Sequence, residues 1–200
     1  MLVAHRGASH DAPENTLASV NLAWQRNVDA VEVDLHLSKD GRAVVIHDDT
    51  TKRTGGKNAK VKEQTLQELR RLDVGRHKGG QWSDQRIPTF EEVLRTVPED
   101  GLLFVDIKCG PEIFPELDAD IGRSHVRPEQ VVLMSFELST AAAAKTRHPE
   151  NCVLWICDPA RSRRGGGRGS AAGRTLAAAR EAGLDGLNVK ARRVVDAAFV

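Results

Sequence analysis

The chain has little cysteine, no long hydrophobic run and almost no net charge. Its three cysteines, Cys109, Cys152 and Cys157, show no C-x-x-C spacing, which argues against a disulfide framework and against a structural zinc site. The formal net charge is +1, so no global charge attracts nucleic acid. No apolar run approaches the roughly 20 residues that span a bilayer, and the N-terminus lacks a signal-peptide pattern. These absences predict a cytoplasmic protein with no stable membrane anchor.

The patterns that are present predict a single α/β domain covering residues 1–200. Apolar strand-like runs alternate with segments of helical period, which is typical of a parallel sheet with crossover helices. After a first strand that ends at His5, we expect strands at 30–37, 42–47, 102–107, 131–136, 152–157 and 185–189. Helical segments are expected near 17–28, 112–124, 137–147 and 171–182, and from 192 onward.

Acidic residues alternate with apolar ones in two of these strands. Glu32 and Asp34 are two residues apart, so their side chains share one face of the strand. Neighbouring carboxylates in an apolar strand repel each other unless a cation or a proton lies between them. Asp106 and Lys108 repeat the alternation, so a single cavity could hold all four side chains. The competing interpretations are a solvated edge strand for the first pair and a plain ion pair for the second.

Two histidines end short apolar runs on either side of the acidic pair. His5 ends the first run, and His47 ends a strand that the turn at 39–41 folds back beside Glu32 and Asp34. A lone histidine at a strand end is more often a surface or hydrogen-bonded residue than a catalyst. As a pair flanking acids, however, the two imidazoles are candidate proton carriers near neutral pH.

The strand count predicts an incomplete (β/α)₈ TIM barrel. Residues 49–88 are polar and rich in Gly, Lys and Thr, and they form a small insertion after the second strand, with capping boxes expected at Thr65 and Thr89. If the hairpin counts as one barrel strand, the chain supplies six strands, whereas a barrel needs eight and typically about 250 residues. We expect the last two strands to be missing because a longer protein has been truncated, with a naturally short chain and an open barrel as the alternative.

An ordered set of short motifs carries a family resemblance. The chain resembles the glycerophosphodiester phosphodiesterase family through His5-Arg6-Gly7, Pro13-Glu14-Asn15-Thr16, Glu32-x-Asp34, Lys39-Asp40-Gly41, His47-Asp48, Ile87-Pro88-Thr89, Asp106-Ile107-Lys108 and Ser135-Phe136. The resemblance implies a TIM-barrel hydrolase that uses Mg²⁺ or Ca²⁺ to split small glycerophosphodiesters into an alcohol and glycerol 3-phosphate. It leaves open the alcohol, the choice of cation and whether the protein is a homo-oligomer.

The same resemblance assigns a role to each charged residue of the predicted cavity. It implies that the general acid/base pair is His5 and His47. It implies that the metal ligands are Glu32, Asp34 and Asp106. The two cations that bind the phosphate would be Arg6 and Lys108. Which histidine acts as the acid stays open. The family usually has glutamate at the position of Asp106, so the shorter side chain predicts weaker metal binding. Glu14 and Asn15 are candidates to orient Arg6, although helix-start chemistry explains them equally well.

Two other functions fit parts of the sequence. A phospholipase D-type enzyme acting on lysophospholipids would be expected to carry an interfacial apolar loop, which the sequence lacks. A non-catalytic phosphodiester-binding remnant is favoured by the missing strands and disfavoured by retention of both histidines and all the charged positions. The arginines between 160 and 170 are interpreted as a solvated loop, with binding of an anionic headgroup as the alternative.

Overall fold

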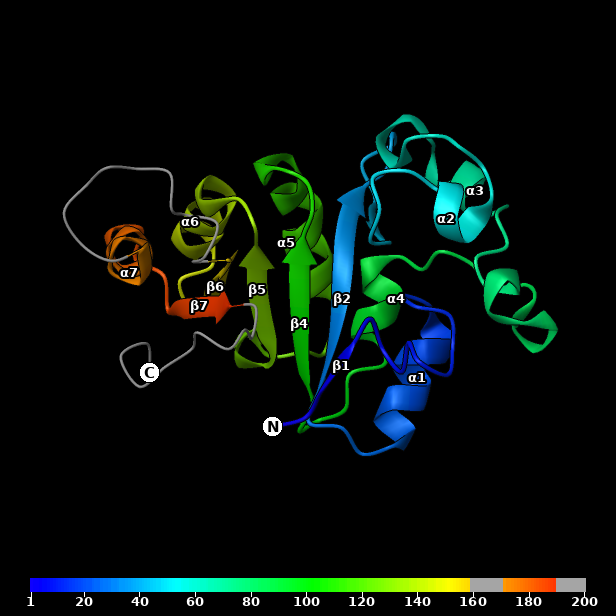
Figure 1. Cartoon of the computed structure of the whole chain (residues 1–200), viewed down its shortest axis with the longest axis horizontal. Coiled ribbons are helices and arrows are strands. Elements are labelled where there is room, and N and C mark those ends of the chain that lie inside the picture. The colour runs from blue at the N-terminus through cyan, green and yellow to red at the C-terminus, as the bar shows by residue number, and fades with distance from the viewer. Residues whose placement is uncertain (159–170, 190–200) are drawn as a thin grey trace.

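The computed structural model describes residues 1–158 and 171–189, which form one curved sheet flanked by helices (Figure 1). Within these residues, six strands run parallel in the order β1-β2-β4-β5-β6-β7, and β3 pairs antiparallel with β2. The strands are β1 (Val3–His5), β2 (Ala30–Leu37), β3 (Ala43–Val45), β4 (Leu102–Ile107), β5 (Val131–Ser135), β6 (Cys152–Cys157) and β7 (Gly186–Val189). Because sequential parallel strands are neighbours, the sheet grows around an arc as a barrel does.

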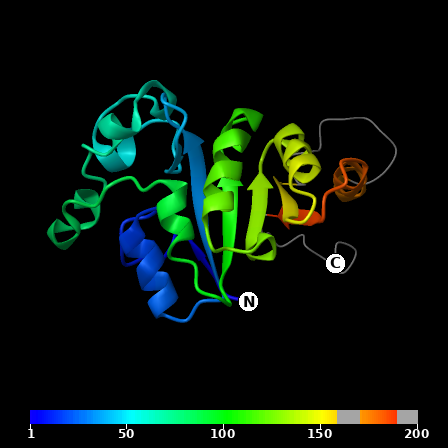
Figure 2. The ribbon, with the colours of Figure 1, turned by 180° about the vertical axis from the view of Figure 1, so that it is seen from behind.

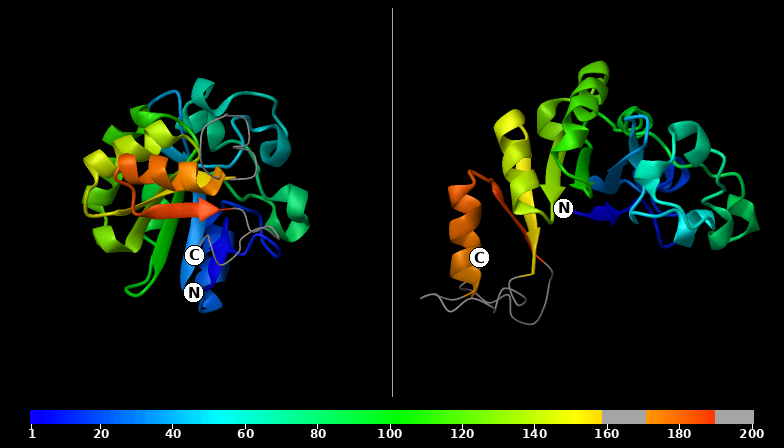
Figure 3. Two further views of the ribbon diagram at one scale, coloured as in Figure 1. Left: turned by 60° about the vertical axis from the view of Figure 1, so that its left-hand side comes forward. Right: turned by 90° about the horizontal axis from the view of Figure 1, so that it is seen from above.

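Helices follow the strands and cover one face of the sheet. The α-helices are α1 (Leu17–Gln25), α2 (Lys52–Gly55), α3 (Leu66–Leu69), α4 (Phe90–Leu94), α5 (Phe114–Arg123), α6 (Leu138–Arg147) and α7 (Ala171–Glu181). The 3₁₀ turns are Val61–Glu63, Arg76–Lys78, Gly80–Trp82, Pro111–Ile113 and Pro128–Gln130. From behind, α5 and α6 lie in front of the sheet (Figure 2). From above, the sheet curls as an arc that does not close (Figure 3).

The main hydrophobic core lies between the sheet and helices α1, α4, α5 and α6. Successive side chains of a strand point to opposite faces, so Val31, Val33 and Leu35 face the helices and are fully buried. The intervening residues of β2, Glu32 and Asp34, therefore face the inside of the arc. Alternation along β2 thus separates the residues that stabilise the fold from those available for chemistry.

The predicted insertion is confirmed as a segment outside the parallel sheet. It contains α2 and α3 and packs a small apolar cluster against β3 and the residue after it, formed by Val44, Ile46, Val61, Leu69, Val74 and Ile87. Figure 1 shows it beside the C-terminal end of β2. The capping boxes expected at Thr65 and Thr89 are both present. The insertion thus lies at the C-terminal end of the strands, which is where parallel α/β barrels carry their active sites.

The predicted α/β class and the six parallel strands are confirmed, with some shifted boundaries. β3 ends at Val45, before His47. The backbone N–H of Ile46 still donates to Asp34 O of β2, whereas that of Val45 donates to Pro88 O. The helix expected from 192 onward and the arginine-rich loop at 160–170 lie outside the described residues. Among the described residues, no helix has the length and hydrophobicity that crossing a membrane requires.

Candidate active site

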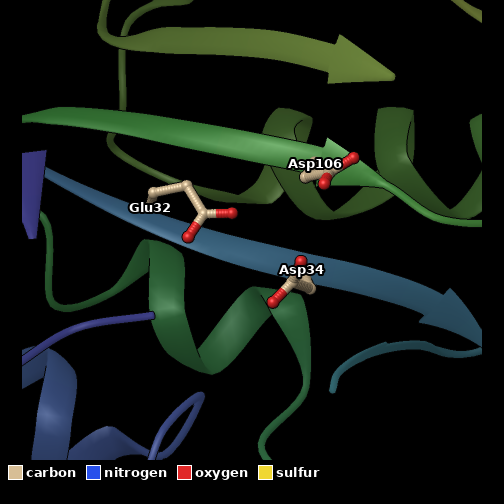
Figure 4. Close-up of side chains that lie close together, drawn as sticks. All are labelled: Glu32, Asp34 and Asp106. Carbon is tan, nitrogen blue, oxygen red and sulfur yellow. The ribbon is translucent and has the colours of Figure 1, made fainter. Parts of the chain in front are cut away.

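Three carboxylates meet on the inner face of the sheet, as predicted (Figure 4). Glu32 and Asp34 lie on β2, and Asp106 lies beside Asp34 in the register of β4. One oxygen of each carboxylate lies within 4.8 Å of the others. The three residues are only 7%, 1% and 4% exposed, respectively. A solvated edge strand, the competing interpretation of Glu32 and Asp34, is therefore wrong.

The electrostatics of this acidic cluster favour a bound cation. Burial, and then the charge of Asp34, raise the pKa of Glu32. Burial also raises the pKa of Asp106, even though Lys108 donates a hydrogen bond to it. The Oδ1 atom of Asp106 is buried and has no hydrogen-bond partner. Buried carboxylates that repel one another and keep an unsatisfied oxygen suit Mg²⁺ or Ca²⁺, because both cations prefer oxygen ligands.

Cationic side chains lie directly against the acids. The Nζ atom of Lys108 is 3.0 Å from Asp34 Oδ1 and also contacts Asp106. Burial would lower the pKa of Lys108, but Asp34 and Asp106 outweigh it and raise it. On the other side, Arg6 Nε is 3.2 Å from Asp34 Oδ2, and Asn15 donates to the same oxygen at 2.8 Å. Asp106 and Lys108 thus do form an ion pair, which was one interpretation of these residues. This pair belongs to a larger network of charges centred on Asp34.

A tight turn after β1 aims Arg6 at two of the acids. Arg6 and Gly7 both have left-handed backbones, with φ of 58° and 75°. A side chain at Gly7 would bring its Cβ within 2.5 Å of the backbone of Ser19, so only glycine fits there. The turn lets the backbone N–H of Arg6 donate to Glu32 Oε2 at 3.0 Å while its guanidinium reaches Asp34. This geometry explains the His-Arg-Gly motif.

The two predicted histidines come together at the same end of the sheet. The Nε2 atom of His5 is 3.9 Å from Glu32 Oε2. Partial burial, and then the charge of Arg6, lower the pKa of His5, and the charge of His47 lowers it further. His47 Nδ1 lies 2.6 Å from Asp48 Oδ1, which leaves Nε2 as the nitrogen available for proton exchange.

An arginine that the sequence did not indicate connects the two sides of the site. Arg53, at α2, donates to both oxygens of Glu14 at 2.8 Å and to both oxygens of Asp48 at 2.8 and 3.0 Å. We call these three residues the carboxylate clamp. Glu14 also accepts from Arg6 at 3.0 Å, and Asp48 contacts His47, so the clamp links a guanidinium to an imidazole.

The clamp carboxylates are stabilised in their charged form. The hydrogen bonds from Arg53 are the main cause, and they lower the pKa of Glu14 and of Asp48 to about 2. Glu14 contacts the guanidinium of Arg6, which is the contact that its predicted role in orienting Arg6 requires. Asn15, with a left-handed φ of 56°, instead contacts Asp34. Arg53 was not predicted, because it lies in a polar insertion whose sequence does not indicate a contact with Glu14 or Asp48.

Comparison with known proteins places this site in a family. The model of the glycerophosphoryl diester phosphodiesterase family matches residues 5–198. The chain belongs to this family. The family match covers every predicted site residue, from His5 to Lys108, and the first and last strands of the sheet end within it.

This family member is similar to two curated glycerophosphodiester phosphodiesterases of known sequence. It is 36% identical over 140 residues to a glycerophosphodiester phosphodiesterase of Caldanaerobacter subterraneus, covering 68% of this chain and 58% of the relative. It is 31% identical over 153 residues to that of Bacillus subtilis, covering 68% and 52%. The chain thus spans less than two thirds of each relative's length.

The structural comparison supports the barrel interpretation of the sheet. A phosphodiesterase of Oleispira antarctica, solved in complex with the product sn-glycerol-3-phosphate, superposes with a TM-score of 0.82 at 28% sequence identity. The superposition covers 94% of this chain and 73% of that one. The open arc of parallel strands in this family member is therefore an incomplete TIM barrel.

Proposed function

We propose that this family member hydrolyses glycerophosphodiesters to an alcohol and glycerol 3-phosphate with the help of a divalent cation. The observation that carries the proposal is the meeting of buried acids with Arg6 and Lys108 at one end of β1, β2 and β4. Attack on a phosphodiester builds negative charge on its non-bridging oxygens. Arg6 and Lys108 can stabilise this charge directly, and the acids can do so by holding a cation. The family match and the product bound to the Oleispira relative support the same substrate class.

Glu32, Asp34 and Asp106 would hold the cation. When bound, Mg²⁺ or Ca²⁺ supplies a Lewis acid for the phosphate oxygens. Arg6 and Lys108 lie against Asp34, so their positive charges border the same space and would stabilise the phosphate. The donor set, made only of carboxylates, does not choose between the two cations.

His5 and His47 would move the protons. One imidazole takes a proton from the attacking oxygen, and the other donates a proton to the departing alkoxide. Asp48 is a carboxylate at neutral pH, since its pKa is lowered to about 2, and it accepts a hydrogen bond from His47 Nδ1. This bond fixes the orientation of the ring and leaves Nε2 to exchange protons with substrate. Either histidine can fill either role in this arrangement.

The first test is release of glycerol 3-phosphate from glycerophosphocholine by the 200-residue chain. We expect turnover with Mg²⁺ or Ca²⁺, none with a chelator, and a loss of at least about 100-fold in His47→Ala. His77→Ala, a change of an exposed histidine in the insertion, is the matched control and should keep the parent rate. Folded chain without turnover would overturn the proposal and favour a binding role.

The same assay separates the remaining alternatives. Turnover of lysophosphatidylcholine with no turnover of glycerophosphocholine would favour the phospholipase D-type reaction. The three cysteines are all unpaired, which agrees with a reducing compartment, and we propose a cytoplasmic location on that basis. The oligomeric state stays open, and sedimentation of the purified chain would measure it.

A further inference from the structure

A cavity of about 520 Å³ opens beside the acidic cluster. Its walls come from the turn between β2 and β3, from the insertion, and from the loop after β4. Lys108 lines this cavity and also contacts Asp34 and Asp106, so the cavity begins where the proposed phosphate site ends. A volume of this size accommodates a group as large as a sugar or an inositol ring.

Lysines dominate the charge of the cavity. Lys39, Lys60, Lys62 and Lys108 line it, against Asp49 and Glu112. Two of these lysines are already engaged, because Lys108 pairs with the acidic cluster and Lys60 lies 3.6 Å from Glu63. The ammonium groups of Lys39 and Lys62 form no hydrogen bond and no ion pair within the described residues. In the part of the chain that the structure describes, the cavity therefore carries two ammonium groups outside any contact ion pair, and its lining holds four lysines against two acids.

Backbone hydrogen bonds fix the wall that carries these lysines. The N–H of Lys39 donates to Gln64 O at 2.9 Å, and the N–H of Val61 donates to Asp49 O at 2.8 Å. In addition, the N–H of Leu66 donates to Asp40 Oδ1 at 2.9 Å. Lys39 on the hairpin and Lys62 on the insertion are thus held on one surface, and both residues are exposed. The backbone positions of the two lysines are fixed, and each ammonium group ends a long side chain. Such a pair suits an anion whose position differs from one alcohol to another.

We propose that this cavity binds the alcohol half of the substrate and selects alcohols that carry a second anionic group, such as a phosphate or a carboxylate. The proposal rests on the proposed function for the position of the scissile phosphate, between Arg6 and Lys108. Lys39 and Lys62 recognise the second anion. Because both are exposed at the surface, their contribution weakens as salt concentration rises.

The test compares two substrates that differ by one phosphate, glycerophosphoinositol and glycerophosphoinositol 4-phosphate. We expect the parent chain to prefer the second by about tenfold in kcat/KM, mainly through KM, and the preference to shrink in high salt. The double variant Lys39→Gln, Lys62→Gln should lose this preference while the KM for glycerophosphoinositol changes by less than about twofold. Lys57→Gln, an exposed lysine of the same insertion that does not line the cavity, is the matched control.

Binding measurements keep this proposal separate from the proposed reaction. Calorimetry with the same two compounds on the His47→Ala chain should show the same preference without turnover. Preferential binding by a chain that hydrolyses neither compound would retain the anion subsite and overturn the reaction. Hydrolysis of both compounds without preference, or an equal effect of the double variant on both, would overturn the subsite and retain the reaction.

Discussion

Two regions of the site use carboxylates in opposite ways. The strand floor, formed by Glu32, Asp34, Asp106 and Lys108, lies on neighbouring strands whose register places like charges side by side. The carboxylate clamp of Glu14, Asp48 and Arg53 joins three segments outside the sheet, and Glu14 and Arg53 are 39 residues apart in the chain. The floor holds its groups through a rigid sheet, whereas the clamp holds its groups through hydrogen bonds.

The difference also appears in the proton affinities. In the floor, burial and neighbouring acids raise the pKa of Glu32, and burial raises that of Asp106. In the clamp, Arg53 lowers the pKa of both carboxylates to about 2. Glu32 and Asp106 are thus short of positive charge and suited to bind a cation. The clamp carboxylates are instead satisfied within the protein and suited to position other side chains.

The largest effect is expected from Asp34→Asn in the floor. The substituted amide would keep the shape of the side chain but lose the charge that faces Arg6, Lys108 and the proposed cation. We expect kcat/KM for glycerophosphocholine to fall by about 1,000-fold or more, with loss of Ca²⁺ binding by calorimetry. Asp100→Asn, at an exposed turn, is the control. Full activity and normal Ca²⁺ binding in Asp34→Asn would remove the floor from the chemistry.

A smaller loss is expected when the clamp is broken by Arg53→Gln. Glu14 and Asp48 would lose the hydrogen bonds that fix them, and Arg6 and His47 would lose their orientation. We expect kcat to fall by about 10- to 100-fold, with a shifted pH profile, since this is the usual range for residues that support functional side chains. Steady-state kinetics between pH 5 and 9 would measure both effects.

The conservative change Arg53→Lys tests whether charge alone supports the clamp. Lysine cannot donate to two carboxylates through a planar fork, so we expect an activity between those of the parent and the glutamine variant. Arg95→Gln, which breaks an exposed pair with Glu91, controls for loss of a surface arginine. If both changes at Arg53 left kcat and its pH profile unaltered, the clamp would have no positioning role.

The same contrast explains how much the sequence could predict. Floor residues are predictable because alternation assigns Glu32, Asp34 and Asp106 to one face, and parallel pairing then brings Asp34 beside Asp106. The hairpin turn at 39–41 similarly predicted the return of His47. β3 is shorter than expected, and the backbone contact of Val45 with Pro88 is one that no local pattern encodes.

Clamp residues could not be predicted, because their contacts depend on how the insertion folds back over the barrel. Arg53 resembles any other cation of a polar segment until α2 brings it beside Glu14. For Glu14 and Asn15, the sequence could not separate helix capping from a site role. The structure resolves this, because Thr16 caps α1 and its two predecessors are free to contact Arg6 and Asp34.

A gain rather than a loss is expected from Asp106→Glu, which lengthens one arm of the floor. The family resemblance gives glutamate as the usual residue here, and the unpartnered Oδ1 of Asp106 shows an oxygen that is not yet satisfied. We expect the longer side chain to tighten Ca²⁺ binding by about two- to tenfold, measured by calorimetry. Unchanged or weaker binding would mean that the neighbouring strands are already spaced for aspartate.

The smallest effect concerns Asp120, a carboxylate buried on the helical side of the sheet, which tests whether burial alone makes an acid functional. Burial, and then Glu116, raise its pKa to about 6, so the folded chain holds this proton more tightly than the unfolded chain does. The resulting stabilisation is full below about pH 4 and is lost as pH rises through 6.

Asp120→Asn cannot ionise and should therefore be more stable than the parent at pH 8, by about 1–2 kcal/mol, but not at pH 4. Urea unfolding at both pH values measures this, with Asp100→Asn at an exposed turn as control, and activity should not change. A loss of stability at pH 8 would show that the bond from Arg123, at 2.7 Å, outweighs burial.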